Sequence, residues 1–261
     1  MKNKYLNEDE IQNFMEKLKR VAEIIQKNYL DELDHKYMQE YAPSHETFKE
    51  IVDLFGFNGM PKILSDEKYK KNTYPEVYRG VIDFDHTAEL LCSKTYNHGT
   101  GYINGIFASE FKDAAEFYTV PIEKNEENDP NKVLSLKVDS DNGIYASDLH
   151  MIANNLSRGI LGFVDDDIKQ KVGLLFYFGN SIADNKLRNR FFMTLENDIS
   201  KLAVILGYDY IRDTKDFLNY TIILNRAKIS VSQSEFNKFC SNSKNYKNFA
   251  VTSSQNQPNI E

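Results

Sequence analysis

Apolar residues repeat at helical spacing in the first part of the chain. From Ile11 to Ile25 they fall on one face of a helix, and Asn7 with Glu10 forms a capping-box pattern at its start. Two further helices are expected, one over residues 29–41 and one that stops at Gly56. The pattern therefore predicts a helical segment over residues 1–56.

The hydrophobic period changes after residue 76, where short runs typical of strands alternate with short helical patterns. We expect strands over residues 77–82, 103–107, 133–138, 172–178, 220–224 and 228–231. Helices are expected over residues 87–94, 110–118, 148–156 and 189–206. Because the order lacks a regular strand–helix alternation, it favours an α+β fold over a doubly wound sheet. We interpret residues 57–244 as the second domain and the Ser/Asn/Gln-rich residues 245–261 as a flexible tail.

The net charge of the chain argues against some classes of binding partner. The 261 residues carry a net charge of −7, so no excess of cations is available for non-specific binding to nucleic acid or to an anionic membrane. No apolar run is long enough to cross a bilayer, and Met1-Lys2-Asn3-Lys4 leads into a polar helix instead of a secretory signal. We therefore expect a cytoplasmic protein that does not act on a membrane. Later delivery to a host or target cell stays open.

Neither the cysteines nor the histidines show the spacing of a metal site. Cys92 and Cys240 form no Cys-x-x-Cys pair, and we interpret them as reduced, packed thiols. His86, His98 and His150 lie on separate elements and have no metal-like spacing with either cysteine. We expect no metal cofactor.

Arg79 and Gly80 lie in the first predicted strand, and a stretch rich in glycine and aromatic residues follows at 99–109. An arginine forks onto a phosphate or a ribose, and a glycine lets a planar ring lie against the backbone. Phe107 ends a predicted strand and Tyr118 ends the next helix, so both rings can converge on one cleft. Such a slot suits a flat, partly cationic ring such as nicotinamide. The alternatives are a plain β-bulge for the glycines and a place in the core for both aromatics.

Several segments resemble motifs of the ADP-ribosyltransferase superfamily. Tyr78-Arg79-Gly80 resembles the first motif of its arginine-type members. The run at 101–108, Gly-Tyr-Ile-Asn-Gly-Ile-Phe-Ala, resembles a segment of its poly-ADP-ribose polymerase side. The run at 220–226, Tyr-Thr-Ile-Ile-Leu-Asn-Arg, resembles a strand of phage-associated and polymorphic-toxin members, and the turn at 206–209 and the run at 58–61 fit the same group. The resemblance covers roughly residues 57 to 231.

The resemblance implies a fold and a site. The family core is a pair of roughly perpendicular small β-sheets with flanking helices, framing a cleft for NAD, which is the substrate. By resemblance Arg79 grips the NAD phosphate or the nicotinamide ribose, and the Gly80 backbone bonds the carboxamide. Phe107 and Tyr118 sandwich the nicotinamide ring. Further NAD-binding residues are expected at Asn104, Ser109 and Asn225.

The sequence departs from the family at the catalytic acid. Where related enzymes carry a glutamate, this chain has Asn219, which can bond a ribose hydroxyl but carries no charge. Asp209, Asp213, Asp216 and Glu235 are substitutes that the sequence does not rank. We name Arg79, Asn219 and Asp216 as the catalytic candidates.

The expected function is mono-ADP-ribosylation, in which NAD is cleaved and ADP-ribose passes to a macromolecular target. The acidic charge favours a protein target slightly over nucleic acid. Three alternatives stay open: an NAD glycohydrolase that uses water, a non-catalytic NAD-binding or interaction module, and a structural component of a phage particle.

Overall fold

The chain forms two compact units that are interleaved along the sequence. The computed structural model describes residues 5–34, 45–93, 104–119, 130–160, 166–213 and 219–243. Unit 1 comprises residues 1–56, 98–105 and 144–208, and unit 2 comprises residues 57–97, 106–143 and 209–261. The first boundary between the units falls after Gly56. The predicted single domain over 57–244 differs from this division, because two later segments belong to unit 1.

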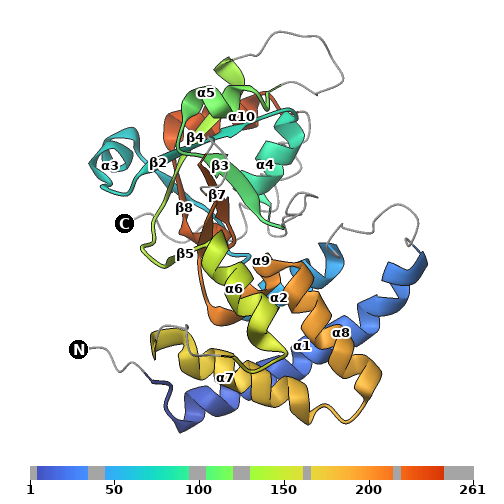
Figure 1. Ribbon diagram of the computed structural model, residues 1–261. Coiled ribbons are helices and arrows are strands. Elements are labelled where there is room, and N and C mark those ends of the chain that lie inside the picture. The colour runs from blue at the N-terminus through green and yellow to red at the C-terminus, as the bar shows by residue number, and fades with distance from the viewer. Residues whose placement is uncertain are drawn as a thin grey trace. The chain divides into compact units, whose positions relative to one another are not determined.

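Unit 1 is built from helices in the described part of the chain (Figure 1). They are α1 (Glu8–Asp34), α2 (His45–Phe55), α6 (Ala146–Leu156), α7 (Asp166–Ser181), α8 (Asn185–Asn197) and α9 (Ile199–Leu206). The capping box before α1 is formed as predicted: the Asn7 and Glu10 side chains each accept the other's backbone N–H at 2.9 Å. Helix α1 continues through residues 29–34, and the rest of the helix predicted over 29–41 lies outside the described residues.

The strand predicted over residues 172–178 is wrong, because this run lies inside α7. Val172, Leu175 and Phe178 are buried at helical spacing, whereas Tyr177 between them is exposed. A short run of branched and aromatic residues fits a buried strand and one face of a helix equally well, so periodicity could not separate the two.

The single helix predicted over residues 189–206 is two helices with a break at Asp198. Asp198 is buried and its carboxylate accepts the Ser200 backbone N–H at 3.1 Å, which caps α9. Lys201 forms a buried ion pair with it at 3.5 Å. Gly207 ends α9 in a left-handed conformation with φ 94°, as the sequence predicts.

Unit 2 carries most of the sheet (Figure 1). Its strands are β1 (Lys62–Leu64), β2 (Glu76–Gly80), β3 (Ile106–Ser109), β4 (Val133–Val138), β6 (Tyr210–Asp213), β7 (Tyr220–Ile223) and β8 (Ile229–Ser232), and β5 (Gly143–Tyr145) begins in it. Its helices are α3 (Asp66–Lys71), α4 (Phe84–Cys92), α5 (Lys112–Glu116) and α10 (Gln233–Ser241), with short 3-10 turns at Pro130–Lys132 and Arg226–Lys228. The fold is therefore mixed α and β, as expected at that level.

The described strands form one sheet of eight, in the order β1-β8-β4-β2-β3-β7-β6-β5, where two separate sheets are expected from the family resemblance. The centre of this sheet is thin. Strand β2 pairs with β4 along its whole length but meets β3 at one residue pair, Tyr78 opposite Ser109. Two four-stranded halves thus join at a single point, and the residues around that point form the candidate site.

Leucines and aromatic residues from α4, β4 and α10 fill the core of unit 2. Leu90, Leu134, Leu136 and Phe239 are all fully buried in one cluster there. This packing fixes β2 and α4 against the rest of the unit, and Arg79 of β2 is only partly buried.

Candidate functional site

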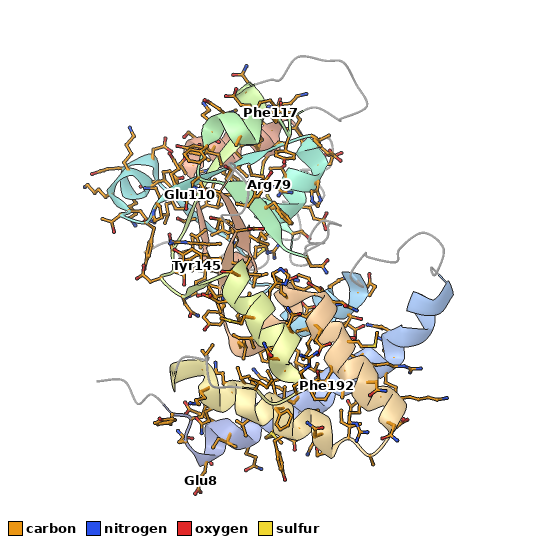
Figure 2. All side chains as sticks on the ribbon, viewed as in Figure 1. Glu8, Arg79, Glu110, Phe117, Tyr145 and Phe192 are labelled. Atoms are coloured by element: carbon orange, nitrogen blue, oxygen red, sulfur yellow. The ribbon has the colours of Figure 1, made fainter. Side chains whose placement is uncertain are left out.

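Arg79 bridges the two halves of the sheet. It lies on β2, where its backbone faces Leu134 of β4. Figure 2 labels Arg79 on the ribbon. Its Nη1 donates a hydrogen bond of 2.8 Å to the backbone oxygen of Phe107 on β3. Because a guanidinium carries several N–H donors in a planar fork, this one bond leaves capacity for a ligand with charged oxygen atoms.

Gly80 lets the end of α5 approach the backbone of β2. A Cβ atom at Gly80 would lie 2.3 Å from the Ala115 oxygen and 2.8 Å from the Tyr118 Cβ. Only glycine fits such a contact. The glycine after Arg79 therefore has a packing role, which is to let Ala115 and Tyr118 lie against the backbone of β2.

Tyr118 and Phe107 meet at a third aromatic residue, Tyr220. The Phe107 and Tyr220 rings are 6.2 Å apart between centroids in a T-shaped arrangement. The Tyr118 and Tyr220 rings are 6.4 Å apart, and their hydroxyl groups form a hydrogen bond. We call these three residues the aromatic cluster. Edge-to-face contacts of this kind are favourable beyond the area they bury.

Tyr220 is a site residue that sequence reasoning missed. The signal was in the strand pairing, because Ser109 and Tyr220 face each other across β3 and β7. Residues that face each other in an antiparallel pair lie on the same face of the sheet, and so do residues two positions apart. Phe107 therefore shares this face with Ser109 and Tyr220.

The strand pairing also places a carboxylate next to the aromatic cluster. Tyr78, Ser109, Tyr220 and Asp213 face one another in turn across β2, β3, β7 and β6. Asp213 is partly buried and directly opposite Tyr220. Opposed Cβ atoms lie roughly 5 Å apart. Several acidic residues are proposed as substitutes for the missing glutamate. Among those that the structure describes, Asp213 lies on the same face of the sheet as the aromatic cluster.

Asn219 precedes Tyr220 in an unusual backbone conformation. Its φ is 38°, and it is the one non-glycine residue with positive φ in the described part of the chain. Asn tolerates this region better than most residues. Its carbonyl oxygen accepts the Glu110 N–H at 3.3 Å, which ties the start of β7 to the end of β3. Next to that junction, Ser109 is buried and its hydroxyl accepts the Phe111 N–H at 3.0 Å.

Helix α4 adds a histidine near Arg79. Burial, reinforced by the positive charge of Arg79, holds the pKa of His86 below its usual value of 6.5. Glu89, whose carboxylate is 3.6 Å from His86 Nδ1, and Asp83 act in the opposite direction. His86 thus reports the electrostatic surroundings of Arg79.

Three sequence-predicted site residues are not part of this arrangement. Asn104 belongs to unit 1, where it is buried and its Nδ2 donates to Asp198 at 2.8 Å. Asn225 is buried in unit 2 and its Nδ2 donates to Asp209 at 2.6 Å. Asp216 lies outside the described residues.

Two other acidic candidates are occupied by structural contacts. Asp209 is buried, and its carboxylate also accepts from the Ser140 hydroxyl at 2.5 Å. It shapes the turn before β6, where its backbone oxygen accepts the N–H groups of Leu224 and Asn225. Glu235 lies at the start of α10 and accepts the Ser135 N–H at 3.1 Å.

Arg226, from the strand motif that resembles phage-type members, is fully buried. Its guanidinium donates to the backbone oxygens of Gly59 at 2.9 Å, Asn58 at 3.0 Å and Ser93 at 2.8 Å. A Cβ at Gly59 would lie 2.7 Å from the Ala227 Cβ, so Gly59 is needed for this close approach. The motif segments at 58–61 and 224–226 are therefore neighbours in the fold. We call Arg226, together with the backbone oxygens that it binds, the arginine lock.

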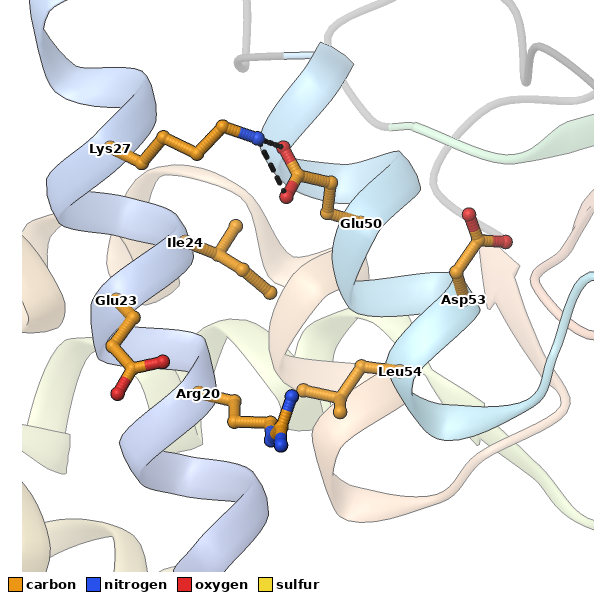
Figure 3. A pocket seen from close by; sticks show the side chains of 7 residues that line it. All are labelled: Arg20, Glu23, Ile24, Lys27, Glu50, Asp53 and Leu54. Atoms are coloured by element: carbon orange, nitrogen blue, oxygen red, sulfur yellow. Dashed lines mark hydrogen bonds and ion pairs between the residues drawn. The ribbon is translucent and has the colours of Figure 1, made fainter.

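A groove of about 530 Å³ lies between α1 and α2 in unit 1 (Figure 3). Its lining mixes charges of both signs with two aliphatic side chains: Arg20, Glu23, Ile24, Lys27, Glu50, Asp53 and Leu54. Lys27 bonds both carboxylate oxygens of Glu50, at 3.0 and 3.2 Å. This groove contains none of the residues that the sequence predicts for NAD.

Within the described ranges, no group of three or more His, Cys, Asp or Glu side chains is placed to hold a metal ion. None of the described helices is both long and apolar enough to cross a membrane. No protein-family model matches the chain, and searches among curated proteins and among solved structures also gave no match. The resemblance to ADP-ribosyltransferases therefore rests on the motif residues alone.

Proposed function

We propose that this protein is a mono-ADP-ribosyltransferase that cleaves NAD and transfers ADP-ribose to a macromolecular target, a protein by preference. The observation that carries the proposal is a set of contacts at the narrow centre of the sheet. Arg79 bonds the backbone of Phe107, Gly80 packs against Tyr118, and the rings of Phe107 and Tyr118 both contact Tyr220. Apart from Tyr220, these residues come from three different elements, and the motif resemblance assigns all of them to NAD.

Arg79 is suited to bind the diphosphate or the nicotinamide ribose, since charge-assisted bonds from a guanidinium to phosphate are strong and often bidentate. The aromatic cluster offers ring surface for nicotinamide, and Tyr118 has 43% of its surface exposed. In the reaction the bond between the ribose C1′ and the nicotinamide nitrogen breaks and neutral nicotinamide leaves. A nucleophile of the target forms the new bond to C1′ and loses its proton.

We assign Asp213 the part of the missing glutamate, in preference to Asn219 and Asp216. The ribose acquires positive charge as nicotinamide departs, and a carboxylate fixed beside it lowers the barrier. Asp213 lies opposite Tyr220 on the cluster's face of the sheet. Asp213→Asn, which keeps the shape but removes the charge, is expected to lower kcat roughly 10²- to 10³-fold with little change in NAD affinity. Asp209→Asn would instead lower stability, because Asp209 is buried in structural contacts.

The experiment that tests the proposal is transfer of label from NAD carrying a tag on its adenine to macromolecules in a cell lysate. Labelled macromolecules should appear with the wild-type protein and disappear with Arg79→Ala. Nicotinamide release without labelling would favour the glycohydrolase. NAD binding without release would favour a non-catalytic module, an alternative motivated by the uncharged Asn219.

A further inference from the structure

Two cysteine thiols meet in the core of unit 2. Cys92 is the last residue of α4, and Cys240 lies in the last turn of α10, 148 positions further along the chain. Their Sγ atoms are 3.3 Å apart. Both are buried, with 6% and 1% of their surfaces exposed.

The packing of α4 against α10 brings the thiols together (Figure 1). Phe84 at the start of α4 and Phe239 of α10 have ring centroids 5.8 Å apart. Arg226 of the arginine lock donates to the Leu90 and Ser93 oxygens at the end of α4. The position of Cys92 is therefore fixed from both sides, and the pairing of the thiols is a consequence of the core.

We propose that Cys92 and Cys240 form a redox-active dithiol that closes to a disulfide by exchange with a small-molecule disulfide, covalently linking α4 to α10. A disulfide has its sulfur atoms about 2.05 Å apart, so closure needs an approach of roughly 1.2 Å. A rotation of the side chains within the last turns of two helices can supply such a movement. The proposal is independent of the NAD chemistry.

The exchange balances with one small disulfide as the oxidant. Because both thiols are buried, the exchange takes place when the last turn of α4 opens transiently. The Cys92 thiolate then attacks one sulfur of the small disulfide and releases the first thiolate, which leaves a mixed disulfide on Cys92. The Cys240 thiolate then attacks the Cys92 sulfur and releases the second. In total the protein loses two hydrogen atoms, and the small disulfide becomes two thiols.

The surroundings assign the two thiols different roles. A hydrogen bond from Cys240 lowers the pKa of Cys92, and the positive charge of Arg226 acts in the same direction against the effect of burial. The same bond and burial raise the pKa of Cys240. Cys92 is therefore the attacking thiol and Cys240 the resolving one, since the thiolate is the nucleophile.

Closure should stabilise the folded protein, because the link spans a long stretch of chain and restricts the unfolded state. By linkage, the folded chain should form the disulfide more readily than the chain unfolded in urea. We expect the equilibrium constant with glutathione to differ by roughly 10²- to 10³-fold between the two states.

The test uses the full-length protein, first reduced and then equilibrated with mixtures of reduced and oxidised glutathione. Free thiols are trapped with a maleimide, and the intact mass is measured. The expected product lacks two hydrogen atoms, carries no maleimide and no glutathione, and melts at a higher temperature than the reduced protein. Peptide mapping should join the segments that contain Cys92 and Cys240.

Single substitutions separate the two roles. Cys240→Ser should accumulate a stable glutathione adduct on Cys92, whereas Cys92→Ser should react more slowly, and neither should gain thermal stability on oxidation. A wild-type protein that keeps both thiols, or that carries glutathione adducts without the intramolecular link, would overturn the proposal. So would a link that forms no more readily in the folded chain than in urea.

Discussion

Two arginines from the family-like motifs have opposite surroundings in unit 2. Arg226 is fully buried and donates to backbone oxygens of two segments, the loop at Gly59 and the end of α4 at Leu90 and Ser93. Arg79 is partly buried and bonds one backbone oxygen, that of Phe107. The N–H donors of Arg226 are used by contacts within the fold, whereas Arg79 keeps donors that a ligand can use. Resemblance to a motif therefore does not by itself distinguish a residue that holds the fold from one that binds substrate.

The largest effect should follow from removing the buried arginine. Arg226→Ala leaves several buried carbonyl oxygens without donors and creates a cavity, so we expect a loss of about 3–5 kcal/mol in the free energy of unfolding. Chemical denaturation measures it, and Arg79→Ala is the matched control, with an expected loss of about 1 kcal/mol. Equal losses for the two variants would contradict the contrast between them.

The second effect concerns NAD affinity. Arg79→Ala removes charge-assisted bonds and is expected to weaken NAD binding by about 2–4 kcal/mol, measured by calorimetry. Arg79→Lys keeps the charge but loses the planar fork, so its NAD affinity should lie between those of the wild type and Arg79→Ala. An unchanged affinity in Arg79→Ala would remove the role assigned to this residue.

A smaller effect should come from the aromatic cluster. Tyr220→Phe keeps the ring contacts but removes the hydroxyl that bonds Tyr118, so the free energy of unfolding should fall by about 1 kcal/mol. Tyr177→Phe, at an exposed position of α7 in unit 1, is the control and should change little. If both variants lose the same stability, the hydroxyl pair contributes nothing.

The smallest effect is a change in the titration of His86. Because its pKa is held below 6.5 in the fold, the neutral imidazole is favoured. Its contribution to stability is present above about pH 6.5 and is lost as the pH falls through the folded pKa. Arg79→Ala should raise the pKa of His86, since a nearby positive charge is removed. A bound diphosphate at Arg79 should raise it as well.

NMR titration of the histidine side chains measures this change with and without NAD. His150, on α6 in unit 1, is the internal control and should not respond. A His86 titration that is the same in the wild type and in Arg79→Ala would show that the two groups do not interact.

Features of the fold that depend only on neighbouring residues are predicted correctly from the sequence. The Asn7 capping box and the helix stops at Gly56 and Gly207 need only neighbouring residues, and all three are formed. The break at Asp198 was missed because a helical pattern runs on both sides of it. Asp198 is also held by a hydrogen bond from Asn104, 94 residues earlier in the chain, and no local pattern contains that contact.

The candidate site was predicted in part for the same reason. Arg79, Gly80, Phe107 and Tyr118 could be named from motifs, but Tyr220 and Asp213 enter through strand pairing. Pairing register depends on how the sheet is assembled, and a one-residue shift would move either side chain to the other face. The partners of Arg226 are backbone oxygens. Because every residue has one, the sequence does not indicate which of them the arginine binds.

The most direct test of the central claim is release of nicotinamide from NAD by purified protein, with and without cell lysate. Wild type, Arg79→Ala and Arg188→Ala are compared, the last being a partly buried arginine of α8 in unit 1. The proposed transferase predicts release that lysate increases, that Arg79→Ala abolishes and that Arg188→Ala leaves unchanged. Release that is absent in the wild type, or that persists in a folded Arg79→Ala protein, would contradict it.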